Sequence, residues 1–139
     1  MNFLLDTNVV SEWAKSKPNS SVLTWLAEVD EDRVFLSVVT LAELRRCVER
    51  LSVGERRKRL EIWLQDDLPL RFESRVIPVD ELVANAWGRV VARREAQGRP
   101  INAMDALIAA TASIHSLTLV TRNEAGFQPT LKAIFNPWN

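Results

Sequence analysis

Short apolar runs alternate with amphipathic helical patterns from one end of the chain to the other, which leaves few architectures open to it. Strands are predicted at residues 2–5, 34–39, 76–79 and 117–120, and a last apolar piece spans 133–135. Parallel strands need crossover connections, and those connections are usually helical. The pattern therefore predicts an α/β fold in which a central, mostly parallel sheet is flanked by helices on both faces.

The helical patterns between these runs have recognisable ends. Thr40 is predicted to open the helix after the second apolar run, which places Glu43 in the first turn. The next helix starts with a basic run and is predicted to stop at Pro69, because proline lacks the backbone N–H that a helix needs. A long helix follows Asp80, and a last one, rich in small and apolar residues, follows Asn102.

Length and composition suit a single domain. The 139 residues, 47% of them hydrophobic, are enough for one core spanning 1–139 that hides about two-thirds of the unfolded surface. No apolar run approaches the roughly 20 residues that cross a bilayer, and the N-terminus lacks the pattern of a signal peptide. We therefore expect a cytoplasmic protein with no membrane contact.

Several function classes are excluded by residue counts. One cysteine and one histidine supply neither an internal disulfide nor a four-ligand zinc site. The 18 basic and 18 acidic residues cancel, which argues against a nucleic-acid binder held only by a basic surface. The four glycines form no phosphate-binding loop, so no organic cofactor is expected.

Three acidic residues are predicted to approach one edge of the sheet. Asp6 directly follows the first strand, Glu43 lies in the helix after the second, and Asp105 lies in the helix that precedes the strand at 117–120. Ligands of open α/β sheets bind beyond the carboxyl ends of the strands. Because neighbouring carboxylates raise one another's pKa, such a cluster needs cations, and oxygen ligands select Mg²⁺ or Mn²⁺.

Each acid can also be explained by a purely structural role. Thr40 and Glu43 have the spacing of a capping box, and Asn102 with Asp105 places an acid near the positive end of a helix. Asp6 is less easily explained in this way, because it ends an apolar strand where α/β enzymes keep catalytic groups. From the residues alone, both interpretations stay open for Glu43 and Asp105.

Five short segments stand in an order that is specific in combination and spans residues 4 to 138. They are Leu5-Asp6-Thr7-Asn8 with Ser11-Glu12, Thr40-Leu41-Ala42-Glu43-Leu44, Asp105-Ala106-Leu107-Ile108-Ala109-Ala110, Thr121-Arg122-Asn123 and Asn136-Pro137-Trp138. With these segments the chain resembles the VapC toxins, which are PIN-domain ribonucleases, and within them the FitB-like subgroup.

The resemblance implies a single PIN domain over 1–139, folded as a three-layer sandwich. It implies the toxin component of a type II toxin–antitoxin system, an endoribonuclease that hydrolyses RNA phosphodiester bonds with Mg²⁺ or Mn²⁺. It further implies a homodimer and a cognate antitoxin of the VapB/FitA type that blocks the active site, with larger toxin–antitoxin assemblies built from both.

By motif, Asp6, Glu43 and Asp105 correspond to the catalytic metal ligands of the family. Asn123 stands in the place of a fourth ligand that is Asp in many PIN domains, so we expect one metal ion to bind firmly and a second weakly. Gly126 stands where the family often has an acid. The supporting polar positions of the family are matched by Thr7, Asn8 and Thr121.

The expected reaction is in-line attack of a metal-activated water on phosphorus, which leaves 5′-phosphate and 3′-hydroxyl ends. His115, expected at a buried helix end, leaves no histidine for general acid–base catalysis.

Basic runs on helices are usually only solvated, but they are the candidates for phosphate contacts. These are Arg45, Arg46, Arg56, Arg57, Lys58, Arg59, Arg93 and Arg94. Four tryptophans on apolar stripes are expected to be core or interface anchors, namely Trp13, Trp25, Trp63 and Trp87.

Two other functions compete with this one. A catalytically inactive PIN-like module that only binds a protein partner would keep the apolar helical faces and use the acids as caps. A phosphatase with Asp6 as nucleophile is disfavoured, because that class needs a second acid two residues on and Asn8 stands there.

Overall fold

The structure is a computed structural model that describes residues 1–139. Its centre is a five-stranded sheet in the order β3-β2-β1-β4-β5, and every pairing in it is parallel. The strands are β1 Phe3–Leu5, β2 Val34–Ser37, β3 Val76–Ile77, β4 Thr118–Val120 and β5 Ile134–Phe135. The predicted α/β fold with a parallel central sheet is therefore confirmed.

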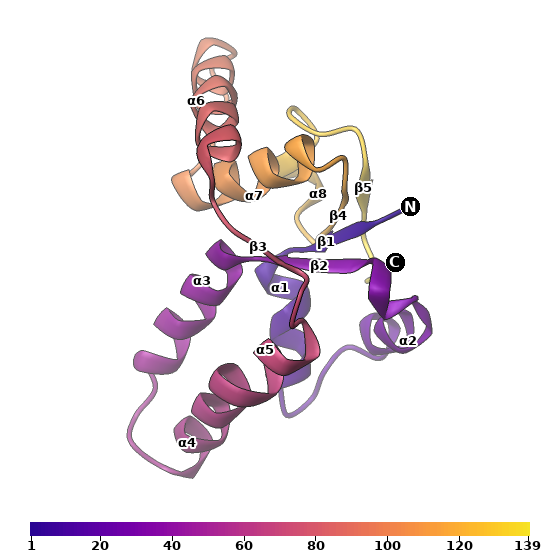
Figure 1. Ribbon diagram of the computed structural model, residues 1–139, viewed down its shortest axis with the longest axis vertical. Coiled ribbons are helices and arrows are strands. Elements are labelled where there is room, and N and C mark those ends of the chain that lie inside the picture. The colour runs from indigo at the N-terminus through magenta and orange to yellow at the C-terminus, as the bar shows by residue number, and fades with distance from the viewer.

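Helices cover both faces of the sheet and complete a three-layer sandwich (Figure 1). In that view α1 to α5 lie below the strands, and α6 to α8 lie above them. The helices are α1 Thr7–Val10, α2 Ser20–Glu28, α3 Val38–Glu49, α4 Glu55–Ile62, α5 Leu68–Arg71, α6 Glu81–Ala96, α7 Ala103–Ile114 and α8 Glu124–Phe127. Shorter 3₁₀ and π turns connect some of them, namely η1 Ser11–Ala14, η2 Glu31–Arg33 and η3 Trp63–Asp67.

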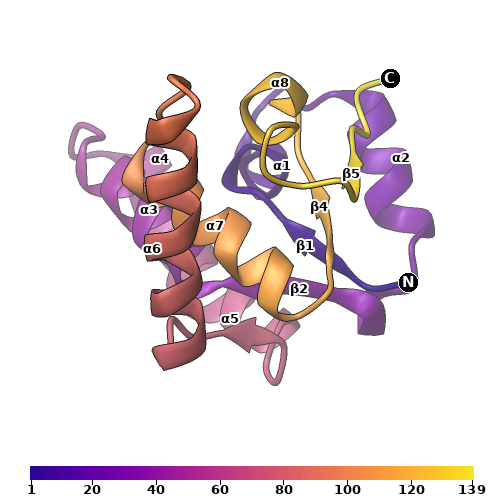
Figure 2. The ribbon, with the colours of Figure 1, turned by 90° about the horizontal axis from the view of Figure 1, so that it is seen from above.

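Alternation along the strands divides the core in two. Leu5 and Val120 face a cluster built with α1, α2 and α3, whereas Leu4 and Leu119 face a cluster built with α7 and α8. Because successive side chains of a strand point to opposite faces, each central strand is buried on both sides and reads as a continuous apolar run. Figure 2 shows α7 packed along the sheet, with α6 as a further layer against it.

The start of α3 differs from the prediction and changes the interpretation of Glu43. Ser37, the last residue of β2, is the N-cap, and its Oγ accepts a hydrogen bond from the N–H of Val39 at 3.0 Å. Thr40 is therefore the third residue of the helix, and Glu43 lies in the second turn. The predicted capping box is wrong. β-branched residues favour a strand locally, but here Val39 and Thr40 belong to the first turn of α3, where both are buried.

Pro69 does not end the helical segment after the basic run. The chain passes from α4 through the π turn η3 into α5, and Pro69 lies in the first turn of α5. A π turn shifts the backbone hydrogen-bond pattern by one residue. The N–H groups in the first turn of a helix have no intrahelical acceptor, so a proline there loses no hydrogen bond. None of the helices has both the length and the apolar character needed to cross a bilayer.

Candidate active site

Asp6 stands where β1 ends and α1 begins. Its backbone N–H donates to the carbonyl of Val120 at 2.9 Å, which fixes it between the two central strands. One carboxylate oxygen, Oδ1, caps α1 by accepting from the N–H of Thr7 at 2.8 Å, and Oδ2 accepts from the hydroxyl of Thr121 at 2.8 Å. Only 6% of Asp6 is exposed, so the chain holds a carboxylate inside the protein at the carboxyl edge of the sheet.

Burial raises the pKa of Asp6 from 3.8 to about 6. The hydrogen bonds from Thr121 and Thr7 act in the opposite direction, since they stabilise the ionised form. The negative charges of Asp105 and Glu43 add the smallest contributions to the rise. Thr7 links two of the three acids directly, because its backbone N–H donates to Asp6 and its hydroxyl donates to Glu43.

Glu43 projects from the second turn of α3 toward the start of α1. Its Oε1 accepts a hydrogen bond from the hydroxyl of Thr7 at 2.6 Å, and the same hydroxyl lies 3.3 Å from that of Thr40. The residue next to Asp6 thus orients the second acid. Since Glu43 caps no helix, the purely structural explanation for this acid loses its main support.

Asp105 lies half-buried in the first turn of α7. The N-cap residue Asn102 holds it twice, by accepting from the N–H of Asp105 at 2.9 Å and by donating its side-chain amide to Oδ2 at 2.8 Å. The position near the positive end of the helix agrees with the sequence, and it stabilises a negative charge there. Position alone therefore does not decide between capping and catalysis for Asp105.

None of the three acids forms an ion pair with a lysine or arginine, since all six ion pairs of the protein use other carboxylates. The free oxygens are of the type that Mg²⁺ and Mn²⁺ prefer. No three acidic, histidine or cysteine side chains form a ready metal cluster, however. The donor chemistry fits a hard divalent cation, and convergence of all three acids on one ion stays a prediction.

Thr121, Asn8 and Asn123 form a polar rim beside Asp6. The Thr121 hydroxyl accepts from the N–H of Asn123 at 3.0 Å, and the Asn8 amide lies 3.5 Å from it. Asn123 also caps a helix, which the sequence did not predict. Its Oδ1 accepts a hydrogen bond from the N–H of Gly126 at 3.1 Å, at the start of α8. The side chain proposed as a fourth ligand is thus engaged in a cap.

Gly126 makes that cap possible. A Cβ at this position would lie 2.3 Å from Nδ2 of Asn123, closer than any real contact. Any side chain at 126 would therefore have to push the Asn123 amide out of its capping position. Gly126 consequently leaves free the space that the Asn123 amide occupies in its capping position.

Two further expectations from the sequence are wrong. Arg94, a candidate phosphate contact, is 6% exposed, and it donates to the carbonyls of Arg99 and Gly126 and to the hydroxyl of Thr130. It is a buried clamp between α6 and the segment around α8. His115 is exposed rather than buried, but it lies at the end of α7 opposite Asp105 and so stays outside the acidic site.

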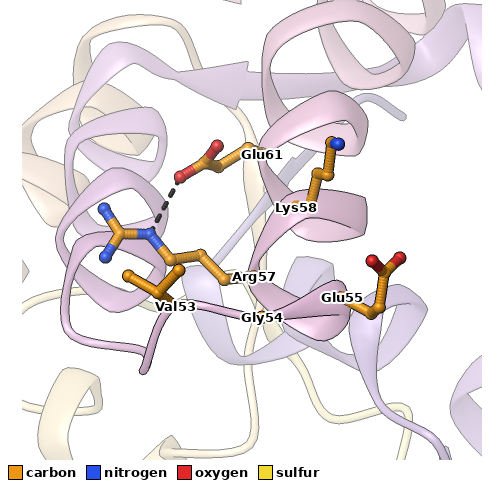
Figure 3. Close-up of a pocket in the computed structure, with 6 residues that line it drawn as sticks. All are labelled: Val53, Gly54, Glu55, Arg57, Lys58 and Glu61. Carbon is orange, nitrogen blue, oxygen red and sulfur yellow. Dashed lines mark hydrogen bonds and ion pairs between the residues drawn. The ribbon is translucent and has the colours of Figure 1, made fainter.

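The widest surface hollow, about 480 Å³, lies elsewhere, at the turn between α3 and α4 (Figure 3). Arg57 contacts two acids there, Glu61 at 2.9 Å and Glu49 at 2.6 Å, and it donates to the carbonyl of Leu51. These contacts join α4 to the end of α3. The charge of Arg57 is therefore already neutralised within the protein, which makes it a poor candidate for an RNA phosphate.

Comparison with known proteins identifies the family. The family model described as PIN domain matches residues 3–129. The chain belongs to the PIN-domain family. The protein named Toxin FitB, from Neisseria gonorrhoeae, is 40% identical over 136 residues, 98% of each chain. The protein named VapC ribonuclease Y4jK, from Sinorhizobium fredii, is 33% identical over 135 residues, 97% of this chain and 96% of its own.

The fold agrees with this assignment. A chain of the crystal structure of FitAcB from Neisseria gonorrhoeae superimposes with a TM-score of 0.93 at 39% identity, covering 99% of both chains. The resemblance to the FitB-like VapC proteins, and with it the PIN-like sandwich, is therefore confirmed.

Proposed function

We propose that this PIN-domain protein is the toxin of a toxin–antitoxin pair and acts as a metal-dependent endoribonuclease. The observation that carries the proposal is the group of unpaired carboxylates around buried Asp6, oriented by neutral donors at the carboxyl edge of the sheet. The similarity to Toxin FitB and to a VapC ribonuclease supports the toxin role and RNA as the substrate.

Asp6, Glu43 and Asp105 would hold Mg²⁺ or Mn²⁺, with Asn123 as a weaker fourth donor. When bound, such a cation supplies a Lewis acid for phosphodiester hydrolysis and lowers the pKa of water. The chain's own part is orientation. Thr121 and Thr7 each donate one hydroxyl hydrogen to a carboxylate, which fixes its direction and leaves further lone pairs free.

The side-chain oxygen of Asn123 already accepts the capping hydrogen bond of α8, and we infer that binding a metal ion would draw it away from this cap. The loss of a capping hydrogen bond costs about 1 kcal/mol, so this donor adds little to metal binding. This supports the expectation of one firm and one weak metal.

We further propose that residues 1–139 act as one domain in the cytoplasm, as a homodimer that a cognate VapB/FitA-type antitoxin inhibits. The support is the family assignment and the similarity to FitAcB over 99% of both chains. Light scattering of the purified protein, alone and with the protein encoded beside it, tests both associations.

The decisive experiment compares cleavage of labelled RNA by wild type, Asp6→Asn and Glu43→Gln, each with Mg²⁺, with Mn²⁺ and with EDTA. Glu43→Gln keeps an oxygen that accepts from Thr7 and removes only the charge. Glu28→Gln is the matched control, because Glu28 is exposed at the far end of α2 and has no ion-pair partner. We expect folded variants in every case and cleavage only by wild type and control in the presence of metal.

The opposite outcome is equally clear. If clean, folded wild type cut no RNA with either metal, or if both variants cut as well as wild type, the nuclease proposal would fail. The chain would then be an inactive PIN-like module that only binds protein.

A further inference from the structure

Three segments that the acidic site does not use meet in the fold beside it. Glu12 lies in η1 after α1, Arg122 directly follows Thr121 at the end of β4, and Trp138 is the second-last residue. The guanidinium of Arg122 lies over the Trp138 ring, 5.4 Å from its centroid. The positive charge of Arg122 in turn helps to lower the pKa of Glu12.

The C-terminal tail is fixed rather than free. The Asn136 amide donates to Glu124 at 3.0 Å, and its Oδ1 accepts from the N–H of Trp138 at 2.9 Å. The carbonyl of Pro137 accepts from the hydroxyl of Ser21 on α2 at 2.8 Å. Figure 2 shows the C-terminus beside α2 accordingly. The Trp138 ring, packed against the core cluster, is thus a rigid platform.

Glu12 is a buried carboxylate whose pKa is lowered in part by the charge of Arg122. Glu12 is only 2% exposed; burial by itself raises its pKa, but the Lys15 ammonium and the N–H of Asn19, at 2.8 Å, outweigh this and lower it. Glu12 is therefore ionised and already paired. It attracts Arg122 electrostatically without a direct ion pair to it, since the only ion pair of Glu12 is with Lys15.

Arg122 itself keeps its hydrogen-bonding edge free. Residue 122 is exposed, and none of its guanidinium N–H groups donates to the protein; its backbone N–H lies 3.5 Å from Oδ1 of Asn8. A guanidinium stacked on an aromatic ring offers its N–H donors in the plane of the stack, which suits bidentate binding of a phosphate. Arg122 directly follows Thr121, whose hydroxyl donates to Asp6, and the contact of the Arg122 backbone N–H with Asn8 lies in the polar rim of the site.

We propose that Arg122 binds a backbone phosphate of the RNA beside the acidic site, and that Trp138 is a positioning residue that holds its guanidinium there. This inference rests on the proposed ribonuclease function and adds a substrate contact to it. The repulsion between an acidic pocket and a polyanion makes a fixed positive charge at the rim useful even when a metal ion is bound.

The first test measures binding of a short, labelled, single-stranded oligoribonucleotide to the non-cleaving Asp6→Asn protein, as a function of KCl at fixed Mg²⁺. Loss of one phosphate contact lowers the slope of log K against log[salt] by about 0.7, which at 0.1 M salt corresponds to about fivefold weaker binding. We expect this change for Arg122→Gln. Lys132→Gln should leave the slope unchanged, because Lys132 is exposed before β5, at the opposite edge of the sheet.

The second test separates positioning from stability. In the cleaving protein, Arg122→Gln should raise KM about fivefold with little change in kcat, whereas a merely structural loss would lower the melting temperature and kcat. Trp138→Ala should reproduce the change in salt slope and add nothing to Arg122→Gln, and Trp138→Phe, which keeps a ring, should restore it.

The results distinguish this inference from the function on which it rests. If wild type cleaves RNA but Arg122→Gln binds with unchanged slope and unchanged KM, the inference is overturned and the nuclease proposal stands. If Trp138→Ala folds and binds normally while Arg122→Gln does not, the positioning role of Trp138 is wrong. If wild type neither binds nor cleaves RNA, both proposals fall.

Discussion

Replacing Asp6 by Asn should make the metal-free protein more stable at neutral pH, although it removes a residue proposed for catalysis. The reason is the buried carboxylate. Burial raises the pKa of Asp6 from 3.8 to about 6, so the folded protein binds a proton that the unfolded chain has already lost in this range. The stability that Asp6 contributes is full below pH 3.8 and is lost as the pH rises through about 6.

The size of the effect follows from the same values. One pKa unit corresponds to about 1.4 kcal/mol, so the difference between 3.8 and about 6 costs the folded state about 3 kcal/mol at neutral pH. Asn carries no charge and therefore avoids this cost. Part of the gain is offset, because the Asn amide replaces one oxygen that accepts from Thr7 or Thr121. A net stabilisation of about 2 kcal/mol should remain, roughly 8 °C in melting temperature.

The assay is thermal or urea denaturation of wild type and Asp6→Asn in EDTA, from about pH 4 to pH 8. Only the difference in the free energy of unfolding between the two proteins is compared, because the titration of groups common to both contributes equally to each. Asp32→Asn is the control, since Asp32 is exposed and its carboxylate has no partner. Adding Mg²⁺ at pH 8 should stabilise wild type and not the variant. Parallel stability curves for wild type and Asp6→Asn across the whole range would refute the reasoning.

Three further predictions concern the supports of the site. Gly126→Ala should cost about 1 kcal/mol in stability, because its Cβ displaces Asn123 from the cap of α8; in an Asn123→Ala background the same change should cost nothing, as urea titration will show. Asn123→Asp should tighten the weaker metal measured by calorimetry without destabilising the fold, since Asp is an equally good cap. Arg94→Met should lower the melting temperature by roughly 10 °C through loss of its buried hydrogen bonds, and unchanged melting would contradict the clamp.

The fold was predictable because its signal is repeated along the chain. Each central strand is buried on both faces and consists mainly of apolar residues, and each is followed by a helical pattern. A sheet so assembled puts the residues after β1 and β4 at one edge, so the place of Asp6 followed from the sequence. That edge holds Thr121 as well, which explains why two residues so distant in sequence share a hydrogen bond.

The details that failed depend on contacts that sequence patterns do not contain. A basic residue on an exposed-looking helix gives no sign that the loop near α8 will bury it, as happens to Arg94. The start of α3 was misplaced because Val38 and Val39 favour a strand locally, whereas the cap by Ser37 turns them into the first helical residues. Arg122 was missed as a substrate contact because its partner, Trp138, lies at the far end of the chain.

The pattern of ion pairs supports the same site from the opposite direction. The chain has as many basic as acidic residues, and several glutamates, including Glu12, Glu49 and Glu61, each contact a lysine or arginine. Around Asp6, where burial makes a negative charge most costly, no lysine or arginine forms an ion pair with the three acids, and only hydroxyl, amide and backbone donors orient them. A fold that needed these carboxylates only for stability would gain by pairing them. Unpaired carboxylates at this edge support the proposed metal site, because a cation from solution would neutralise them, and the denaturation experiment with Mg²⁺ tests this.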